Sequence, residues 1–146
     1  MAYPTQTLDR TVEDIDRLAA NIKQYAIRRK SDMEIGSVGS TTIFDVAINV
    51  RDARNRLAAM AAVPGIAAKA ASLKGVDEAL IAADFNAMLA AMDNIVAWVA
   101  ANFPKDANGF LLSQTLSADG PIDRQFTTTQ TATFRTQLDS LIAAID

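Results

Sequence analysis

Apolar residues recur every three or four positions along most of this chain, a spacing that predicts helices. The first stripe predicts a helix that begins near Thr7 or Thr11 and ends at about Lys30; it consists of Leu8, Val12, Ile15, Leu18, Ile22 and Tyr25. The second predicts a helix from Thr41 or Thr42 to Val63; it consists of Ile43, Val46, Val50, Ala53, Leu57 and Met60. Polar residues occupy the other faces, so each helix should have one side in water.

The segment 76–103 contains neither Pro nor Gly, and its apolar residues cover more than one helix face. It predicts a long helix over about 77–103, preceded by a short Ala-rich helix over 66–74 that Gly75 can end. We interpret the long helix as the centre of the bundle, because the stripes of the other helices each need an apolar wall. Charged and amide residues interrupt it, including Asp84 and Asp93, which favours a core helix over a membrane span.

The final third of the chain changes character. Two turn signals, Asn108-Gly109 and Asp119-Gly120-Pro121, predict extended chain or a short β-hairpin over about 105–125. Thr127 and Gln130 have the spacing of a capping box, which predicts a last helix from there to the end of the sequence. The fold class is therefore an all-α bundle of four main helices plus one short helix around a long central helix, in a single domain over 1–146.

The segment 31–41, SDMEIGSVGST, has Gly and Ser but no sustained helical period. Two interpretations remain open: an ordered loop that places its apolar residues under the bundle, or a flexible arm that inserts into a neighbouring subunit. We hypothesise that the apolar residues of this segment and of 105–125 contact partners; they are Met33, Ile35, Val38, Phe110, Leu111 and Leu112.

The composition excludes much catalytic chemistry, because the 146 residues include no His and no Cys. These two residue types supply the commonest acid or base near neutral pH, the thiol nucleophile and most zinc ligands. No phosphate-binding glycine motif occurs either. We therefore predict no enzyme, no catalytic or metal-binding residue, no cofactor and no small-molecule substrate. An enzyme that uses only carboxylates, Lys or Tyr is the least favoured alternative, since no cluster of such residues is visible.

Charge gives no sign of nucleic acid or membrane as a partner. The net charge is -3, which creates no general attraction to phosphate. Arg51, Arg54 and Arg56 spread over about half of a helix circumference, and the run 28–30 ends a helix, where the dipole favours cations. The favoured interpretation of both clusters is a solvated surface. For the run 28–30 the alternative is a phosphate or nucleic-acid contact. For the three arginines the alternative is a contact with another subunit or with nucleic acid. The first nine residues lack the features of a secretory signal.

Two stretches resemble small structural proteins of tailed bacteriophages. One is FPKD at 103–106 with GFLL at 109–112, and the other is QTATFRTQLDSL at 130–141. The resemblance implies a virion component present in many copies and assembled in the host cytoplasm: a head-to-tail adaptor, a tail protein or a capsid-associated subunit. Its implied partners are other virion proteins and copies of itself. No residue of known function carries over.

The alternative function belongs to another class. A cellular helical binding module or small regulator would hold a partner helix or an apolar ligand in a groove between the first two helices. The wide apolar surface of the predicted helices favours this alternative.

Overall fold

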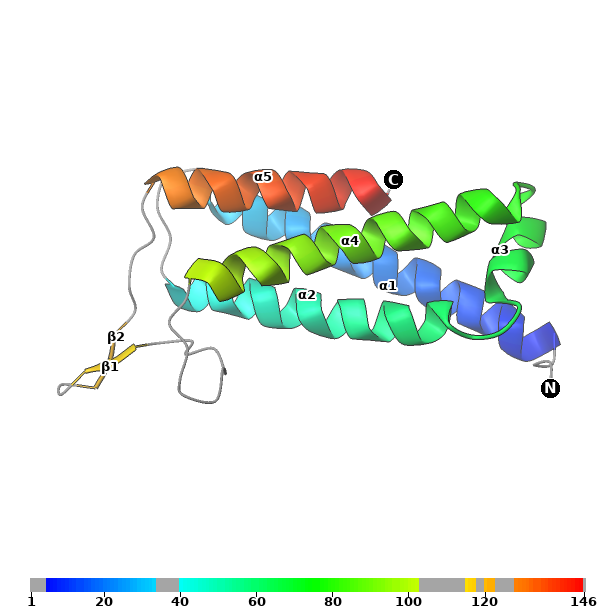
Figure 1. Ribbon diagram of the computed structural model, residues 1–146, viewed down its shortest axis with the longest axis horizontal. Coiled ribbons are helices and arrows are strands. Elements are labelled where there is room, and N and C mark those ends of the chain that lie inside the picture. The colour runs from blue at the N-terminus through cyan, green and yellow to red at the C-terminus, as the bar shows by residue number, and fades with distance from the viewer. Residues whose placement is uncertain (1–4, 34–39, 103–114, 118–119, 123–127, 146) are drawn as a thin grey trace.

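The computed structural model describes residues 5–33, 40–102, 115–117, 120–122 and 128–145, and the helices among them form a bundle (Figure 1). The helices are α1 (Thr5–Asp32), α2 (Ser40–Ala61), α3 (Ile66–Lys74), α4 (Glu78–Asn102) and α5 (Thr128–Ile145). Two short strands, β1 (Thr115–Ser117) and β2 (Gly120–Ile122), pair antiparallel. The turn between the strands and most of 105–125 lie outside the described residues, so the hairpin stays a prediction.

Four of the helices form the bundle in the order α1, α2, α4, α5. Each packs against the next, and α5 packs back against α1. Neighbours in this ring run antiparallel, as the colours of Figure 1 show. α1 and α4 therefore lie diagonally opposite one another across the core. The predicted central helix is wrong in this respect, because α4 forms one corner of the ring of four described helices.

The reason for this error is visible in the alanines of α4. Ala79, Ala83, Ala87, Ala90 and Ala97 are exposed. They make α4 apolar in composition all round, although each offers little area to bury. The large residues keep to one side, where Ile81, Phe85, Met88, Met92, Ile95 and Val99 are buried. Leu80 departs from the predicted stripe, with 56% of its surface exposed.

The stripes predicted for the other helices form the rest of the core. In α2 all six stripe residues except Met60 are buried, and Met60 is half-buried. In α5 the buried side chains are Phe134, Leu138 and Leu141. The 3.6-residue period of the sequence thus becomes a continuous core between the four helices.

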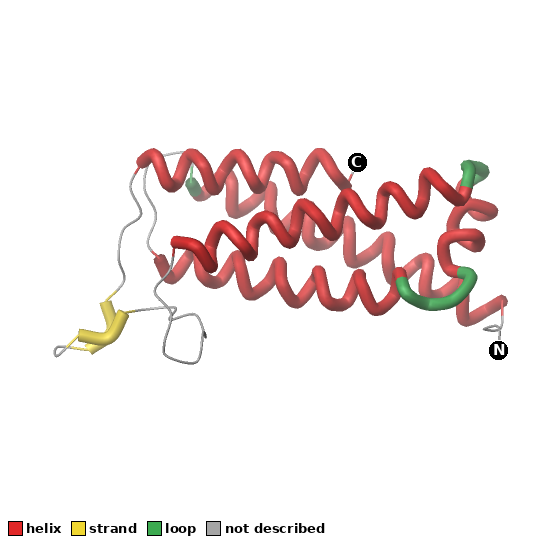
Figure 2. The backbone as a smooth tube through the Cα atoms, in the orientation of Figure 1, coloured by secondary structure: helices red, strands yellow, loops and turns green. Residues whose placement is uncertain are grey.

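α3 closes the end of the bundle that α5 does not reach (Figure 2). Its axis differs from that of α2 by 91°. Gly65 and Gly75 flank it with φ values of 83° and 69°, a left-handed conformation that strains other residues. Lys69 and Lys74 pair with Asp9 and Asp16 of α1 at 3.0 and 2.9 Å. The prediction of a short helix that Gly75 ends is confirmed.

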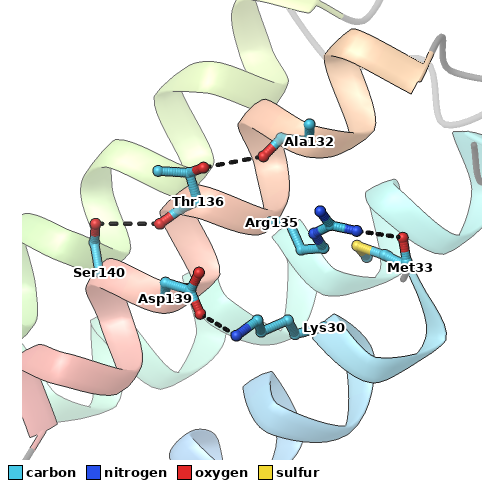
Figure 3. A network of polar contacts seen from close by, with 7 residues as sticks. All are labelled: Lys30, Met33, Ala132, Arg135, Thr136, Asp139 and Ser140. Atoms are coloured by element: carbon cyan, nitrogen blue, oxygen red, sulfur yellow. Dashed lines mark hydrogen bonds and ion pairs between the residues drawn. The ribbon is translucent and has the colours of Figure 1, made fainter. Parts of the chain in front are cut away.

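The other end of α1 is fixed by α5 (Figure 3). Lys30 Nζ lies 2.6 Å from Asp139 Oδ1, and Arg135 Nη1 donates to the carbonyl oxygen of Met33 at 3.1 Å. The Arg135 guanidinium is therefore close to the carbonyl end of α1, which its charge favours. α1 extends to Asp32, which pairs with Arg29 at 3.0 Å, and α2 already starts at Ser40. The predicted segment 31–41 is thus too long at both ends.

By length and composition alone, α4 could cross a membrane, and α2 with α3 would count as a second span only if taken as one broken helix. The core helix of a bundle passes the same test. Of the apolar window in α4, 33% is buried within the bundle. Its packing against α2, α3 and α5 accounts for the apolar side of this helix.

Candidate binding groove between α1 and α2

A groove of about 680 Å³ lies between α1 and α2 on the outside of the bundle. From α1 it is lined by Asp14, Arg17, Leu18, Asn21, Ile22 and Tyr25. From α2 it is lined by Asn49, Asp52, Ala53, Arg56, Ala59 and Met60. Leu18, Ile22, Ala53 and Met60 supply an apolar floor, and charged and amide side chains form the rim.

The groove follows from the residues on the flanks of the two helices. Within this floor Leu18 and Met60 are only half-buried, whereas Ile22 and Ala53 belong to the core. Ala53 and Ala59 are too short to fill the space that a larger side chain would occupy. The polar rim residues keep their charged or amide groups in water and do not close over the floor. The two helices consequently leave apolar surface open between them.

A hydrogen bond across one end of the groove sets the register of the two helices. Asn49 Nδ2 donates to the hydroxyl oxygen of Tyr25 at 3.0 Å and to the carbonyl oxygen of Asp45 at 2.9 Å. The guanidinium of Arg29 lies over the Tyr25 ring, 5.3 Å from its centroid. Desolvation lowers the pKa of Arg29, but its interactions with Tyr25 and then Asp32 raise it, and the net direction is upward. This end of the groove is therefore fixed from both helices.

The register places Arg17 and Arg56 at the same level on opposite walls. Arg17 precedes Tyr25 by eight residues, about 12 Å of helix, and Arg56 follows Asn49 by seven, about 10.5 Å. Because the helices are antiparallel, both displacements run in the same direction. Asp14 lies 3.6 Å from Arg17. Arg56 has no ion pair or hydrogen bond within the described part of the chain.

The three arginines of α2 do not form one basic surface. Arg51 lies 3.9 Å from its neighbour Asp52, and Arg54 Nε pairs with Asp93 of α4 at 2.9 Å. Only Arg56 faces the groove. At the end of α1, Arg29 and Lys30 likewise have carboxylate partners. These carboxylates offset much of the positive charge that a nucleic-acid-binding surface would need.

A second, smaller hollow of about 360 Å³ lies between α4 and α5. Asn94, Trp98, Gln137 and Ser140 line it together with Ala91 and Ala97. The Trp98 ring packs on Phe134, with centroids 5.3 Å apart, so this tryptophan contributes to packing. Gln137 Oε1 is buried and has no hydrogen-bond partner in the described part of the chain. A third hollow of about 90 Å³ lies between α1, α4 and the end of α5.

The structure places only one of the partner contacts hypothesised from the sequence. Met33 is fully buried. Ile35, Val38, Phe110, Leu111 and Leu112 lie outside the described residues. No group of three or more acidic residues placed to hold a metal ion occurs within the described ranges.

Sequence reasoning anticipated the place of the groove but not the residues of its rim. The available signal was a second, polar line beside each apolar stripe. In α1 it consists of Asp14, Arg17 and Asn21, and in α2 of Asn49, Asp52 and Arg56, again at steps of three and four. Such a line by itself is typical of any half-exposed helix, so it identifies a groove only once the register is known.

In comparisons with known proteins, no family model, no curated protein and no solved structure matches this chain. The functional argument therefore depends on the residues of this chain.

Proposed function

We propose that this protein is a non-enzymatic structural subunit of a bacteriophage virion that acts by self-assembly and by contacts with neighbouring virion proteins. Head-to-tail adaptors, tail proteins and capsid-associated subunits are the candidate roles. The observation that carries the proposal is the α1–α2 groove, which combines an apolar floor with a charged rim. Such surfaces suit protein docking, because the floor gains from being covered and the rim selects the partner.

The resemblance to small phage structural proteins supplies the biological setting. Part of the stretch 130–141 belongs to the core, since Phe134, Leu138 and Leu141 are fully buried. Arg135 and Asp139 in the same stretch fix α5 to the end of α1. The residues that carry this part of the resemblance therefore stabilise the bundle. The resemblance supports the proposed class of protein, but it does not identify a contact surface.

The irregular segments complete the proposal. The part of 31–41 between the helices and the segment 105–125, with its predicted hairpin, would supply further contacts through Ile35, Val38, Phe110, Leu111 and Leu112. The subunit would be assembled in the host cytoplasm and reside in the virion. Its partners would be proteins, with no membrane, nucleic acid or small-molecule substrate among them.

Density-gradient fractionation of a phage lysate tests the virion setting. We expect mass spectrometry to find this chain in the particle fraction at a constant ratio to the other virion proteins. Its absence from purified particles would overturn the proposal. Native mass spectrometry of the purified chain at micromolar concentration measures self-association separately.

A pair of matched variants tests the groove in the same particles. Ala59 lines the groove and Ala87 lies on the outer face of α4, and both are exposed helical alanines. We expect Ala59→Glu to reduce incorporation at least about tenfold, since a charge placed on an apolar contact is costly, whereas Ala87→Glu is incorporated normally. Loss of incorporation with Ala87→Glu alone would place the contact on α4 and contradict the role of the groove.

The groove also favours a second candidate function, a cellular helical binding module that holds a partner helix or an apolar ligand. Its volume of about 680 Å³ falls within the range of small-molecule sites. Affinity purification from the host distinguishes the two candidates. One stoichiometric host protein, in place of virion proteins, would favour the binding module.

A further inference from the structure

We propose that the α1–α2 groove binds an amphipathic helix of a partner protein that presents an acidic side chain to Arg17 and Arg56. This inference rests on the proposed function, since it names the chemistry of the partner that the groove would take.

The length of the groove fits a short helix. Its lining runs from Tyr25 and Asn49 at one end to Asp14 and Met60 at the other. These ends are eleven residues apart on each helix, which corresponds to about 16 Å or three helical turns. A third helix can lie between two antiparallel helices and place residues at i, i+4 and i+7 on their apolar floor.

The charges of the rim define what that helix must carry. Arg17 and Arg56 line opposite walls of the groove, and the rise of the two helices puts them within about 1.5 Å of the same level. Two like charges that face one another are unfavourable, and an anion between them relieves the repulsion. Asp14 offsets part of the charge of Arg17, but Arg56 has no partner within the described ranges. A glutamate or aspartate from the partner can pair with both guanidiniums and complete the site.

The fixed end of the groove supports a defined position for that acid. The bond between Asn49 and Tyr25 holds α1 and α2 in register, so the two arginines stay opposite one another. Asp52 lies about one turn nearer to this end, and Asp14 lies at the opposite end, so each repels an acid placed beside it. The acidic residue of the partner should therefore lie at the level of Arg17 and Arg56, between these two carboxylates.

A synthetic probe tests the proposal on the purified full-length chain. The probe is a stapled Ala-rich helix with Leu at i, i+4 and i+7 and Glu at i+3, and its counterpart carries Lys in place of Glu. In a titration followed by two-dimensional NMR, we expect the amides of Arg17, Asn21 and Arg56 to shift, and the Trp98 indole signal to stay unchanged. The Glu probe should bind about fivefold more tightly than the Lys probe, as expected for exposed ion pairs.

Charge reversal at two arginines of α2 provides a matched control. Arg56→Glu should reverse the preference between the probes, whereas Arg51→Glu, the same change on the same helix outside the groove, should preserve it. Arg56→Gln should remove most of the preference without reversing it. Because Arg56 makes no described contact, far-ultraviolet circular dichroism should be the same for its variants and the parent chain.

Three results would overturn the inference: equal affinity for the two probes, no shift at the groove at about 1 mM Glu probe, or larger shifts of the groove amides with duplex DNA. Its failure is distinguishable from failure of the proposed function. If Arg56→Glu enters particles as well as the parent chain while Ala59→Glu does not, the acidic contact is wrong and the groove remains the docking site. If the parent chain is absent from particles, the virion proposal is wrong.

Discussion

The α1–α2 and α4–α5 pairs are both antiparallel neighbours in the bundle, yet they close very differently. Between α4 and α5, Trp98 packs on Phe134, and Phe134 itself is completely buried. Between α1 and α2, Leu18 and Met60 are only half-buried, and a polar bridge from Asn49 to Tyr25 spans the interface. Large aromatic side chains pack between α4 and α5, whereas between α1 and α2 a hydrogen bond lies beside an open apolar floor.

This difference shows how a bundle can keep its geometry while leaving a surface for binding. Ala53 and Ala59 are too small to fill the space between α1 and α2. Between α4 and α5, the aromatic rings of Trp98 and Phe134 pack on one another. The register of α1 and α2 is maintained by Asn49 and Tyr25 at one end and by the core residues beneath. The α4–α5 side should therefore contribute mainly to stability and the α1–α2 side mainly to binding. Substitutions on the two sides should affect these two properties separately.

The largest effect is expected from Phe134→Ala. Removing a fully buried aromatic ring leaves a cavity and deprives Trp98 of its partner, which should lower the free energy of unfolding by about 3–5 kcal/mol. Urea unfolding followed by the fluorescence of Trp98, the single tryptophan of the chain, measures the change. The affinity of any α1–α2 groove probe should stay unchanged in the folded protein.

Met60→Ala is the corresponding change on the open side. Since Met60 is half-buried, it should cost less than about 1.5 kcal/mol of stability. It removes part of the groove floor, so it should weaken binding of the helical probe severalfold. If Met60→Ala and Phe134→Ala lowered the free energy of unfolding equally, the proposed division of stability and binding between the two sides would be wrong.

A smaller effect of opposite sign is expected from Thr131→Val in α5. Thr131 is 1% exposed, and its hydroxyl oxygen has no hydrogen-bond partner among the residues that the structure describes. An unpaired buried hydroxyl is unfavourable, so an apolar side chain of the same shape should raise the free energy of unfolding by about 1 kcal/mol.

Thr136 provides the control for that prediction. Its exposed hydroxyl donates to the carbonyl oxygen of Ala132 within the same helix (Figure 3). Thr136→Val should change stability by less than about 0.5 kcal/mol, as surface substitutions usually do. A loss of stability in Thr131→Val would mean that the buried hydroxyl has a partner, such as an ordered water.

Much of the fold could be predicted from the sequence because its signals are local. Pro64, Gly65 and Gly75 mark the limits of α3, whose bounds agree with the prediction. The role of α4 could not be predicted in this way. Its hydrophobicity is partly due to alanines that stay in water, and only their neighbours in space reveal which face is buried.

The candidate site depends on long-range register, which the sequence does not encode locally. Arg17 and Arg56 are far apart in the chain, and each has the ordinary appearance of a surface arginine. They line opposing walls of one groove because Tyr25 and Asn49 meet between the adjacent helices α1 and α2. For the same reason, the sequence suggested a groove between the first two helices but did not suggest its charges.

Apart from the control variants, the smallest expected effect concerns the hydrogen bond between Tyr25 and Asn49. Tyr25→Phe removes the acceptor of the Asn49 bond and keeps the ring beneath Arg29. Since both residues are partly exposed, the loss should be about 0.5–1 kcal/mol. A double-mutant cycle with Asn49→Ala, measured by urea unfolding, should give a coupling of similar size, whereas Asn55→Ala, an exposed change on the same helix, should show none. A coupling near zero would mean that the core alone sets the register, and the open side of the molecule would then need no polar bridge to keep Arg17 and Arg56 opposed.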